Sequence, residues 1–370
     1  MRLKHFGQLL SVGCALSAAA SAEPKPTLDC DAYRGVVELA AAGQRRPAQA
    51  QLRALEEPFL NERILTDRGH YRTLALGCIG SAPWRAKRAA ALLHLDNAID
   101  YRREYRTVRS ALNQLTAEDL LRDLGRSGGQ AARFAVSSYL ALGYSLQASA
   151  EPATAIDYFE RALRLRPQLA EAQLGIGTVQ EKLGNYQAAQ AALQAAIALN
   201  PSLAEAHLRL GLCLGRLGDD KGARAELERA AELSRSRGEG KSAPPSARIR
   251  PGETLPPPEF VHYVASAELG MLELRRERFK QAAALLEQAL ESDPSEQSTY
   301  IALAYAYDRS GSIDRSIELT RRALAVATES SGAGYRYRYD RCQHYRCADL
   351  LAQMWDEVGA EAGPSAGGVP

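Results

Sequence analysis

One interval, 34 residues, recurs through the middle of this chain. The residues that keep it are Gly143, Gly177 and Gly211, then Ala155, Ala189 and Ala223, then Ala162, Ala196 and Ala230. Pro167 and Pro201 keep it as well. A fixed interval of this length is typical of a unit of supersecondary structure that repeats, and such units stack on one another into solenoids.

Each unit is predicted to be a pair of helices. The units run over 136–167, 170–201 and 204–235. The small residues allow the two helices to approach closely, and bulky residues such as Phe159 and Leu193 fill the contact. Gly184 stands where the first helix must end in a left-handed residue, and Pro167 stops the second helix because proline lacks an amide donor. One such pair cannot bury its apolar face alone, so neighbouring units must stack.

The pattern resembles the tetratricopeptide repeat. The residues that carry the resemblance in the first unit are Leu142-Gly143, Ala155, Phe159, Ala162 and Pro167. Two further units fit it, over 263–294 and 297–328. Asp220, at a position that is usually aromatic, and Arg235, in place of the closing proline, depart from it. The resemblance implies an all-α, right-handed superhelix of helix-turn-helix units with an atypical N-terminal helical cap and a C-terminal capping helix.

The segments around the repeats complete the expected organisation. We expect residues 23–135 to form a degenerate, TPR-like helical region, residues 136–235 to form units one to three, and residues 263–328 to form units four and five. Residues 236–262 are rich in proline and glycine, which predicts a surface loop or linker that also acts as a hinge between units three and four. Two other interpretations remain for this insert: a polyproline handle at "TLPPPEF" and a phosphate loop at "GEGKS", although the preceding helix and Arg235 disfavour the latter.

The first 22 residues have the pattern of a secretory signal peptide. A basic start precedes an apolar stretch, and Ala20-Ser21-Ala22 forms a cleavage site. A lipoprotein cleavage before Cys14 is the alternative, disfavoured by Ser11. Removal of Arg2 and Lys4 lowers the 46 basic residues to 44, equal to the acidic ones. We therefore expect a periplasmic protein with no integral membrane segment after cleavage and no nucleic-acid partner.

An oxidising compartment favours disulfides between exposed cysteines. We expect a bond between Cys30 and Cys78, which fall in successive predicted hairpins, and a second between Cys342 and Cys347. Cys213 lies between two leucines of a predicted helix, where a buried thiol behaves as a small apolar residue, and is expected to stay free.

The stretch "GYRYRYDRCQHYRC" precedes an apolar stripe at helical spacing. We expect residues 329–358 to form a disulfide-closed strap and a capping helix laid on the exposed end of the stack. The stripe comprises Leu350, Leu351, Met354, Trp355 and Val358. Two alternatives remain for the strap: a metal site at Cys342, His344 and Cys347, and stacking of its tyrosines and arginines on nucleic acid. Residues 359–370 are expected to be a disordered tail.

No catalytic motif occurs in the sequence, and we expect no enzyme activity, cofactor or metal. His207 occupies a position that is tyrosine in other units, which predicts packing at a helix junction. An enzyme whose activity lies in residues 23–135 is a third possibility beside the two binding functions considered next.

The resemblance implies a concave groove lined by the first helix of each unit. Transferred position by position, the groove residues are Leu140, Tyr144, Leu174, Thr178, Lys182, Leu208, Leu212, Arg216, Met271, Arg275, Ile301, Tyr305 and Arg309. An apolar floor with a basic edge suits a peptide that carries some acidic residues. We therefore expect a non-enzymatic scaffold or adaptor of the bacterial envelope that binds a protein or peptide. The alternative is a binder of an anionic polysaccharide in an export or wall-assembly system.

Overall fold

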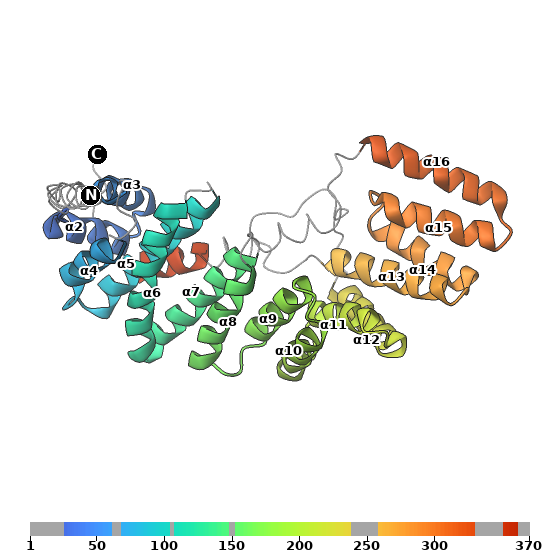
Figure 1. Cartoon of the computed structure of the whole chain (residues 1–370), viewed down its shortest axis with the longest axis horizontal. Helices are drawn as coiled ribbons and strands as arrows, with labels where there is room; N and C mark the ends of the chain where they lie inside the picture. Colours follow the sequence, from blue (N-terminus) through green and yellow to red (C-terminus); the bar gives the residue numbers. More distant parts are fainter. Residues whose placement is uncertain are drawn as a thin grey trace, which may run out of the picture.

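The described part of the chain is helical throughout. The computed structural model describes residues 26–60, 68–103, 107–147, 152–237, 258–329 and 351–361, and every regular element within these ranges is a helix. Successive helices stack side by side into a curved solenoid that runs from α2 to α16 (Figure 1). The expected all-α repeat architecture is confirmed.

The helices fall into an N-terminal group and five pairs. The N-terminal group comprises α2 (Cys30–Ala41), α3 (Arg45–Glu56), the short 3-10 helix η1 (Glu57–Phe59), α4 (Arg68–Ile79), α5 (Trp84–Arg103) and α6 (Thr107–Arg126). The pairs are α7 (Gly129–Gln147) with α8 (Pro152–Leu165), α9 (Ala170–Lys182) with α10 (Tyr186–Leu199), α11 (Ala204–Arg216) with α12 (Asp220–Arg237), α13 (Pro258–Arg275) with α14 (Phe279–Ser292), and α15 (Gln297–Arg309) with α16 (Ile313–Glu329). A last helical stretch covers residues 351–361.

The repeated glycines allow the two helices of a pair to touch. A Cβ atom built on Gly177 would lie 2.6 Å from Leu193 Cγ, the bulky residue of the second helix. The same approach recurs in other pairs, between Gly143 and Phe159 (2.6 Å to Cε1), Gly211 and Leu227 (2.7 Å to Cγ), and Gly270 and Leu286 (2.6 Å to Cγ). Each glycine therefore occupies a space that no side chain fits.

The ends of the helices follow their local sequence. Gly184, Gly218 and Gly311 have φ of 79°, 84° and 85° at the turn between the two helices of a pair. Glu277 takes the equivalent place in the fourth pair with φ 57°. Because Arg235 replaces the closing proline of the third unit, α12 extends over 18 residues, against 14 for α8, α10 and α14.

The helices on either side of the insert between units three and four pack against each other. Helix α12 continues to Arg237 and α13 begins at Pro258, so the segment between them is shorter than the expected 236–262. Phe260 and Val264 of α13 belong to the same apolar cluster as Leu227 of α12. The apolar faces of α12 and α13 pack on each other in the same way as those of other neighbouring helices. The proline-rich sequence changes the connection between the two helices but not these faces. The GEGKS segment and nearly all of the proline-rich stretch lie outside the described residues.

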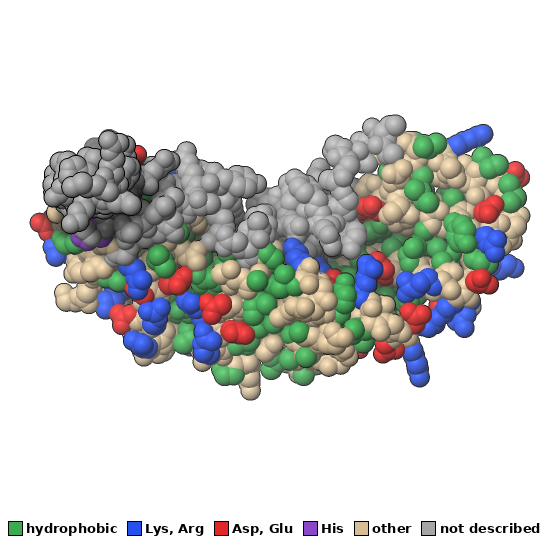
Figure 2. All heavy atoms as spheres, in the orientation of Figure 1, with side chains coloured by type: hydrophobic (Ala, Val, Ile, Leu, Met, Phe, Trp, Pro, Cys, Tyr) green, Lys and Arg blue, Asp and Glu red, His purple; other side chains and the backbone are tan. Residues whose placement is uncertain are grey.

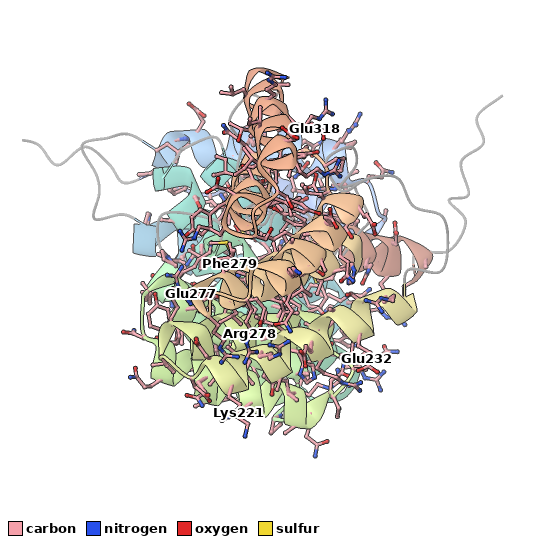
Figure 3. All side chains as sticks on the ribbon, turned by 90° about the vertical axis from the view of Figure 1, so that its right-hand side faces the viewer. Lys221, Glu232, Glu277, Arg278, Phe279 and Glu318 are labelled. Atoms are coloured by element: carbon pink, nitrogen blue, oxygen red, sulfur yellow. A yellow bond between two sulfur atoms is a disulfide. The ribbon has the colours of Figure 1, made fainter. Side chains whose placement is uncertain are left out.

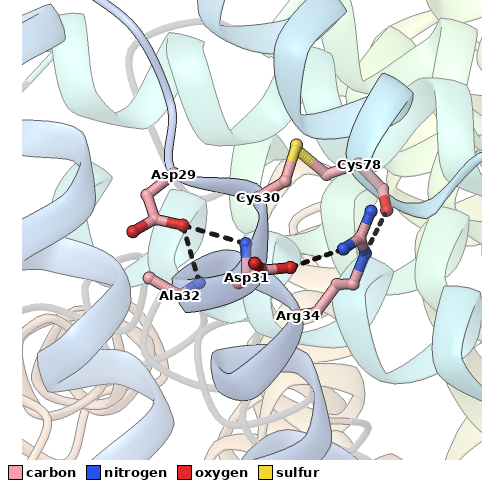
Figure 4. The surroundings of a disulfide bond; sticks show 6 residues. All are labelled: Asp29, Cys30, Asp31, Ala32, Arg34 and Cys78. Atoms are coloured by element: carbon pink, nitrogen blue, oxygen red, sulfur yellow. Dashed lines mark hydrogen bonds and ion pairs between the residues drawn. A yellow bond between two sulfur atoms is a disulfide. The ribbon is translucent and has the colours of Figure 1, made fainter.

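A disulfide ties the N-terminal helices together. Cys30, the first residue of α2, is bonded to Cys78 near the end of α4, across a sequence separation of 48 (Figure 4). Beside the bond, the Asp29 carboxylate accepts from the backbone amides of Asp31 and Ala32, and Arg34 donates to the Cys78 carbonyl. The predicted bond is confirmed, and Cys213 is buried and free as expected. Burial raises the pKa of the Cys213 thiol to about 12, which keeps it protonated. Cys342 and Cys347 lie outside the described residues.

The C-terminal helix lies at the opposite end of the solenoid from the one predicted. Residues 351–361, the red ribbon beside α7 in Figure 1, pack against the N-terminal helices and not on α16. The apolar stripe is buried as expected, because Met354 and Trp355 join the N-terminal core. The helix also continues to residue 361, into the segment expected to be a disordered tail. Apolar spacing predicts that a face is covered but does not identify the surface that covers it.

We predict that Gly177→Ala destabilises the protein. The new methyl group must displace the buried Leu193 side chain, so the free energy of unfolding should fall by about 1–3 kcal/mol. Gly35→Ala is the matched control, because Gly35 is also helical but a Cβ there meets nothing within 4 Å. The control should stabilise the protein by about 0.5–1 kcal/mol through helix propensity. Urea unfolding followed by circular dichroism measures both, and equal effects would contradict the pairing of α9 with α10.

The Cys30→Ser/Cys78→Ser variant should be less stable than the oxidised protein. A crosslink that closes a loop of this length restricts the unfolded chain and stabilises the fold by about 4 kcal/mol. Thermal and urea unfolding, with and without reductant, measure the effect. Reductant should lower the stability of the natural sequence to that of the variant and leave the variant unchanged.

Candidate interaction surface

The expected groove positions divide into a buried group and an exposed group. Leu140, Tyr144, Leu174, Thr178 and Leu208 are buried; Lys182 and Leu212 are half-buried; Arg216, Met271, Arg275, Ile301, Tyr305 and Arg309 are exposed. The buried members belong to units one to three, while most of the exposed members belong to units four and five. Accessible apolar positions of the groove are therefore concentrated on α13 and α15.

The exposed apolar patch comprises Met271, Ile301 and Tyr305. Their exposed fractions are 41%, 54% and 51%, which is high for side chains of this kind. Met271 and Tyr305 take equivalent places in consecutive units, and Ile301 lies one turn before Tyr305. The two helices that carry the patch are joined by a buried hydrogen bond of 2.8 Å between the hydroxyls of Tyr263 and Thr299. The patch is therefore held on a rigid base.

The basic residues of this edge differ in their surroundings. Lys182 Nζ donates to the Gln147 carbonyl at 3.1 Å, and Arg275 donates to Asp220 at 3.2 Å. The Arg309 guanidinium lies over the Phe279 ring, 5.4 Å from its centroid, and Tyr305 packs edge-on against the same ring. Figure 3 shows Phe279 beside Glu277, at the turn that opens α14. The far edge of the patch therefore combines two aromatic rings with one cation.

A second surface, not anticipated from the sequence, holds the C-terminal helix. Trp355 Nε1 donates to Asp96 Oδ2 at 3.0 Å, and Ser138 Oγ donates to Met354 Sδ at 3.5 Å. At the end of the helix, Arg88 donates to both carboxylate oxygens of Glu361, at 3.0 and 2.8 Å. The hydrogen-bonding residues of the surface lie on α5 and α7, and Arg45 of α3 lies over the Trp355 ring. The apolar stripe was the only signal of this contact in the sequence.

The Asp96 carboxylate, which accepts the hydrogen bond from the Trp355 indole, is itself buried. Asp96 is buried on α5 and accepts two hydrogen bonds of 2.6 Å from Arg45 of α3 and one of 2.9 Å from Gln49. Burial raises the pKa of the Asp96 carboxyl, whereas the hydrogen bonds from Arg45 and Trp355 favour its ionised form. The Arg45 guanidinium also lies 5.9 Å from the centroid of the Trp355 ring.

Helix α5 carries a second buried polar group, His94. The Tyr33 hydroxyl lies 2.8 Å from His94 Nε2, and Asn113 Oδ1 lies 2.7 Å from Nδ1. Donation by the hydroxyl to Nε2 and by Nδ1 to the amide oxygen satisfies a neutral imidazole. Burial lowers the pKa of His94 to about 4. His207, as predicted, packs at a helix junction, 2.7 Å from Glu226 Oε2 and 3.1 Å from the Pro201 carbonyl.

The repeat pairs match a known family. Residues 140–189, 174–238 and 268–333 match the tetratricopeptide repeat. These segments are tetratricopeptide repeats. They correspond to α7–α12 and α13–α16, and repeats of this family serve as protein-interaction scaffolds. The N-terminal helices that hold the C-terminal helix lie mostly outside the matched segments.

Solved tetratricopeptide-repeat structures are similar at low identity, and no curated protein matches the chain. A crystal structure of MamA protein shares 19% of its residues, with a TM-score of 0.41, and covers 52% of this chain and 92% of its own. MamA from Desulfovibrio magneticus RS-1 shares 17%, with a TM-score of 0.42 and coverages of 53% and 97%. YrrB, titled a TPR protein with an unusual peptide-binding site, shares 19%, with a TM-score of 0.38 and coverages of 55% and 89%.

Two other properties of the described residues bear on the surface. They contain no group of three or more histidine, cysteine, aspartate or glutamate side chains placed to hold a metal ion. Among their helices, none combines the length and the apolar character that crossing a membrane requires. The predicted signal peptide and the Cys342, His344 and Cys347 cluster fall outside these residues.

Acid should weaken the fold through His94. Its pKa is about 4 in the folded chain and about 6.5 when unfolded, so the unfolded state binds a proton first as the pH falls. Stability from this group is complete above pH 6.5 and should decrease by about 2–3 kcal/mol towards pH 4. Urea unfolding at several pH values should show a shallower acid loss for His94→Gln, whose side chain does not titrate. Parallel pH profiles would contradict the buried neutral imidazole.

Proposed function

We propose that the protein is a non-enzymatic scaffold of the bacterial envelope that binds a partner peptide on units four and five. The observation that carries this proposal is the exposed apolar patch of Met271, Ile301 and Tyr305, which lies on the first helices of two consecutive repeats. Apolar side chains this exposed are commonly covered by a partner when they gather on a rigid surface.

The surroundings of the patch indicate the chemistry of the peptide. Apolar side chains of the peptide would lie on Met271 and Ile301, and an acidic residue would approach Arg309. Because Arg309 lies over Phe279, its guanidinium is held in place with less loss of side-chain entropy when it meets a carboxylate. An extended or helical peptide with alternating apolar and acidic residues fits this surface best.

The envelope location is supported by two observations. The first 22 residues have the composition of a secretory signal. Cys30 and Cys78 are bonded, and disulfides of this kind persist in oxidising compartments and are rare in the cytosol.

An anionic polysaccharide is the second candidate partner. A recess between α6, α7 and α8 is lined by four arginines, which favours an anionic ligand; they are Arg122, Arg126, Arg161 and Arg164. Three of these charges are paired within the protein: Arg122 with Asp119 at 2.7 Å, Arg161 with Glu118 at 3.1 Å and Arg164 with Glu160 at 4.0 Å. Basic and acidic side chains also alternate over the face seen in Figure 2. A peptide partner therefore suits the charge distribution better than a polymer of one charge.

Ile301→Glu/Tyr305→Glu should abolish capture of the partner. The tagged full chain and its variants are incubated with envelope extract, and bound proteins are quantified by mass spectrometry. New carboxylates in the patch would have to be desolvated against apolar side chains, so binding should fall by about a hundredfold or more. The matched control is Leu324→Glu, at a position 62% exposed on α16, outside the first helices of the units.

The expected result is a protein captured by the natural sequence and by Leu324→Glu but absent with the double variant. Apolar docking should also persist at 0.5 M salt, at which exposed charges are largely screened. Equal capture by all three chains, or binding that disappears in salt, would exclude peptide docking on this patch.

A further inference from the structure

The C-terminal helix occupies a groove that has the character of a recognition site. Four residues on three helices form this helix-docking groove, and they are Arg45 of α3, Arg88 and Asp96 of α5, and Ser138 of α7. The occupant buries four apolar side chains there: Leu351, Met354, Trp355 and Val358. Polar contacts lie in the middle of this apolar strip, at Met354 and Trp355, and beyond its end, at Glu361. They fix the position of the helix along the groove.

We propose that the helix-docking groove binds amphipathic helices, that the chain's own C-terminal helix is a displaceable occupant, and that a partner helix competes for it. The site lies on the N-terminal helices and is separate from the patch on α13 and α15. The two surfaces can therefore be tested independently.

The charged residues of the groove keep partners when the helix leaves. Asp96 retains two hydrogen bonds from Arg45 and one from Gln49 without Trp355. Arg88 retains the ring of Trp84, 5.2 Å from its guanidinium, and that of Phe134 at 6.0 Å. Departure of the occupant therefore leaves Asp96 its ion pair with Arg45, while Arg88 exchanges the Glu361 carboxylate for water and keeps its two ring contacts. An ionised carboxylate that keeps its partner avoids the main cost of breaking a buried polar contact.

The occupant also loses little polar bonding when it leaves. Glu361 is partly exposed in the bound state and gains full hydration on release, and the Trp355 indole NH exchanges one carboxylate for water. What holds the helix is mainly the burial of four apolar side chains on one face of 11 residues. A second helix with the same face would gain the same contacts.

The contacts define the kind of helix that fits. Apolar residues are required at the positions of Leu351, Met354 and Val358, which fall on one face at helical spacing. An indole at the position of Trp355 supplies the NH donor for Asp96. A carboxylate six residues later, as at Glu361, meets Arg88. The partner is thus an amphipathic helix with a tryptophan followed six residues later by an acidic residue.

Competition with a tethered occupant makes the site selective. Residues 330–350 connect α16 to the C-terminal helix, so the occupant is present at an effective concentration on the order of mM. A weak free helix does not displace it, whereas one that binds more tightly does. Opening of the groove thus depends on the strength of the partner helix.

The test uses a fluorescently labelled peptide with the sequence of residues 348–362 and the full-length chain. Trp355→Ala in the chain removes the indole contact and vacates the groove. Fluorescence anisotropy should show that the peptide binds this variant about a hundredfold more tightly than the natural sequence, in which the tethered helix competes. Gln353→Ala, at an exposed position of the same helix, is the matched control and should bind no better than the natural sequence. The peptide with alanine in place of tryptophan should not bind either chain.

A second measurement uses the natural sequence alone, so that it does not depend on the variant folding. Hydrogen exchange followed by mass spectrometry should show amides 351–361 exchanging at least tenfold faster than those of α5. Exchange of both segments at the same rate would mean that the helix opens only on global unfolding, and would overturn the proposal. So would a folded Trp355→Ala chain that does not bind the peptide. A dimer detected by light scattering would indicate that the helix in the groove comes from a second copy of the chain, and it would overturn the proposal of a separate partner.

Discussion

The contact between a glycine of one helix and a bulky residue of the next sets the geometry of this protein. Gly177 faces Leu193 so closely that no side chain fits between them, and the same pair of positions recurs along the stack. Close approach makes each helix pair a flat unit with two apolar faces, and each face requires a neighbour. The solenoid therefore continues across the insert after Arg237, because α12 and α13 meet face to face whatever the connection between them.

A stack of this kind has two apolar ends, and in this protein the two ends are covered to different extents. At the N-terminal end, a disulfide, the enclosed α5 and the C-terminal helix close the core. At the other end, α16 leaves Ile313, Ile317 and Leu324 substantially exposed. The C-terminal helix covers the N-terminal helices and not α16. There, Asp96 and Arg88 form polar contacts with Trp355 and Glu361.

The repeat units could be predicted from the sequence because most of the structural requirements there strongly favour one residue type. Gly143, Gly177 and Gly211 mark close contacts, and Gly184 marks a left-handed turn. The location of the C-terminal helix could not be predicted in this way. Its stripe is compatible with any apolar surface. The residues that select the N-terminal surface, Arg88 and Asp96, lie 273 and 259 positions away in sequence from the residues they contact. The positions transferred from the repeat pattern lie on the first helices of the units, but they differ in burial, because exposure depends on what else packs over each helix.

Contact between Trp355 and Asp96 also changes the energetics expected of a repeat protein. In an open solenoid, stability is close to a sum of terms between neighbours. Here residues 259 positions apart are in contact, so one term joins the two ends of the chain. The groove for this contact exists only when α3, α5 and α7 are already packed. A displaceable C-terminal helix, as proposed, would form this contact after those helices pack and lose it before they open.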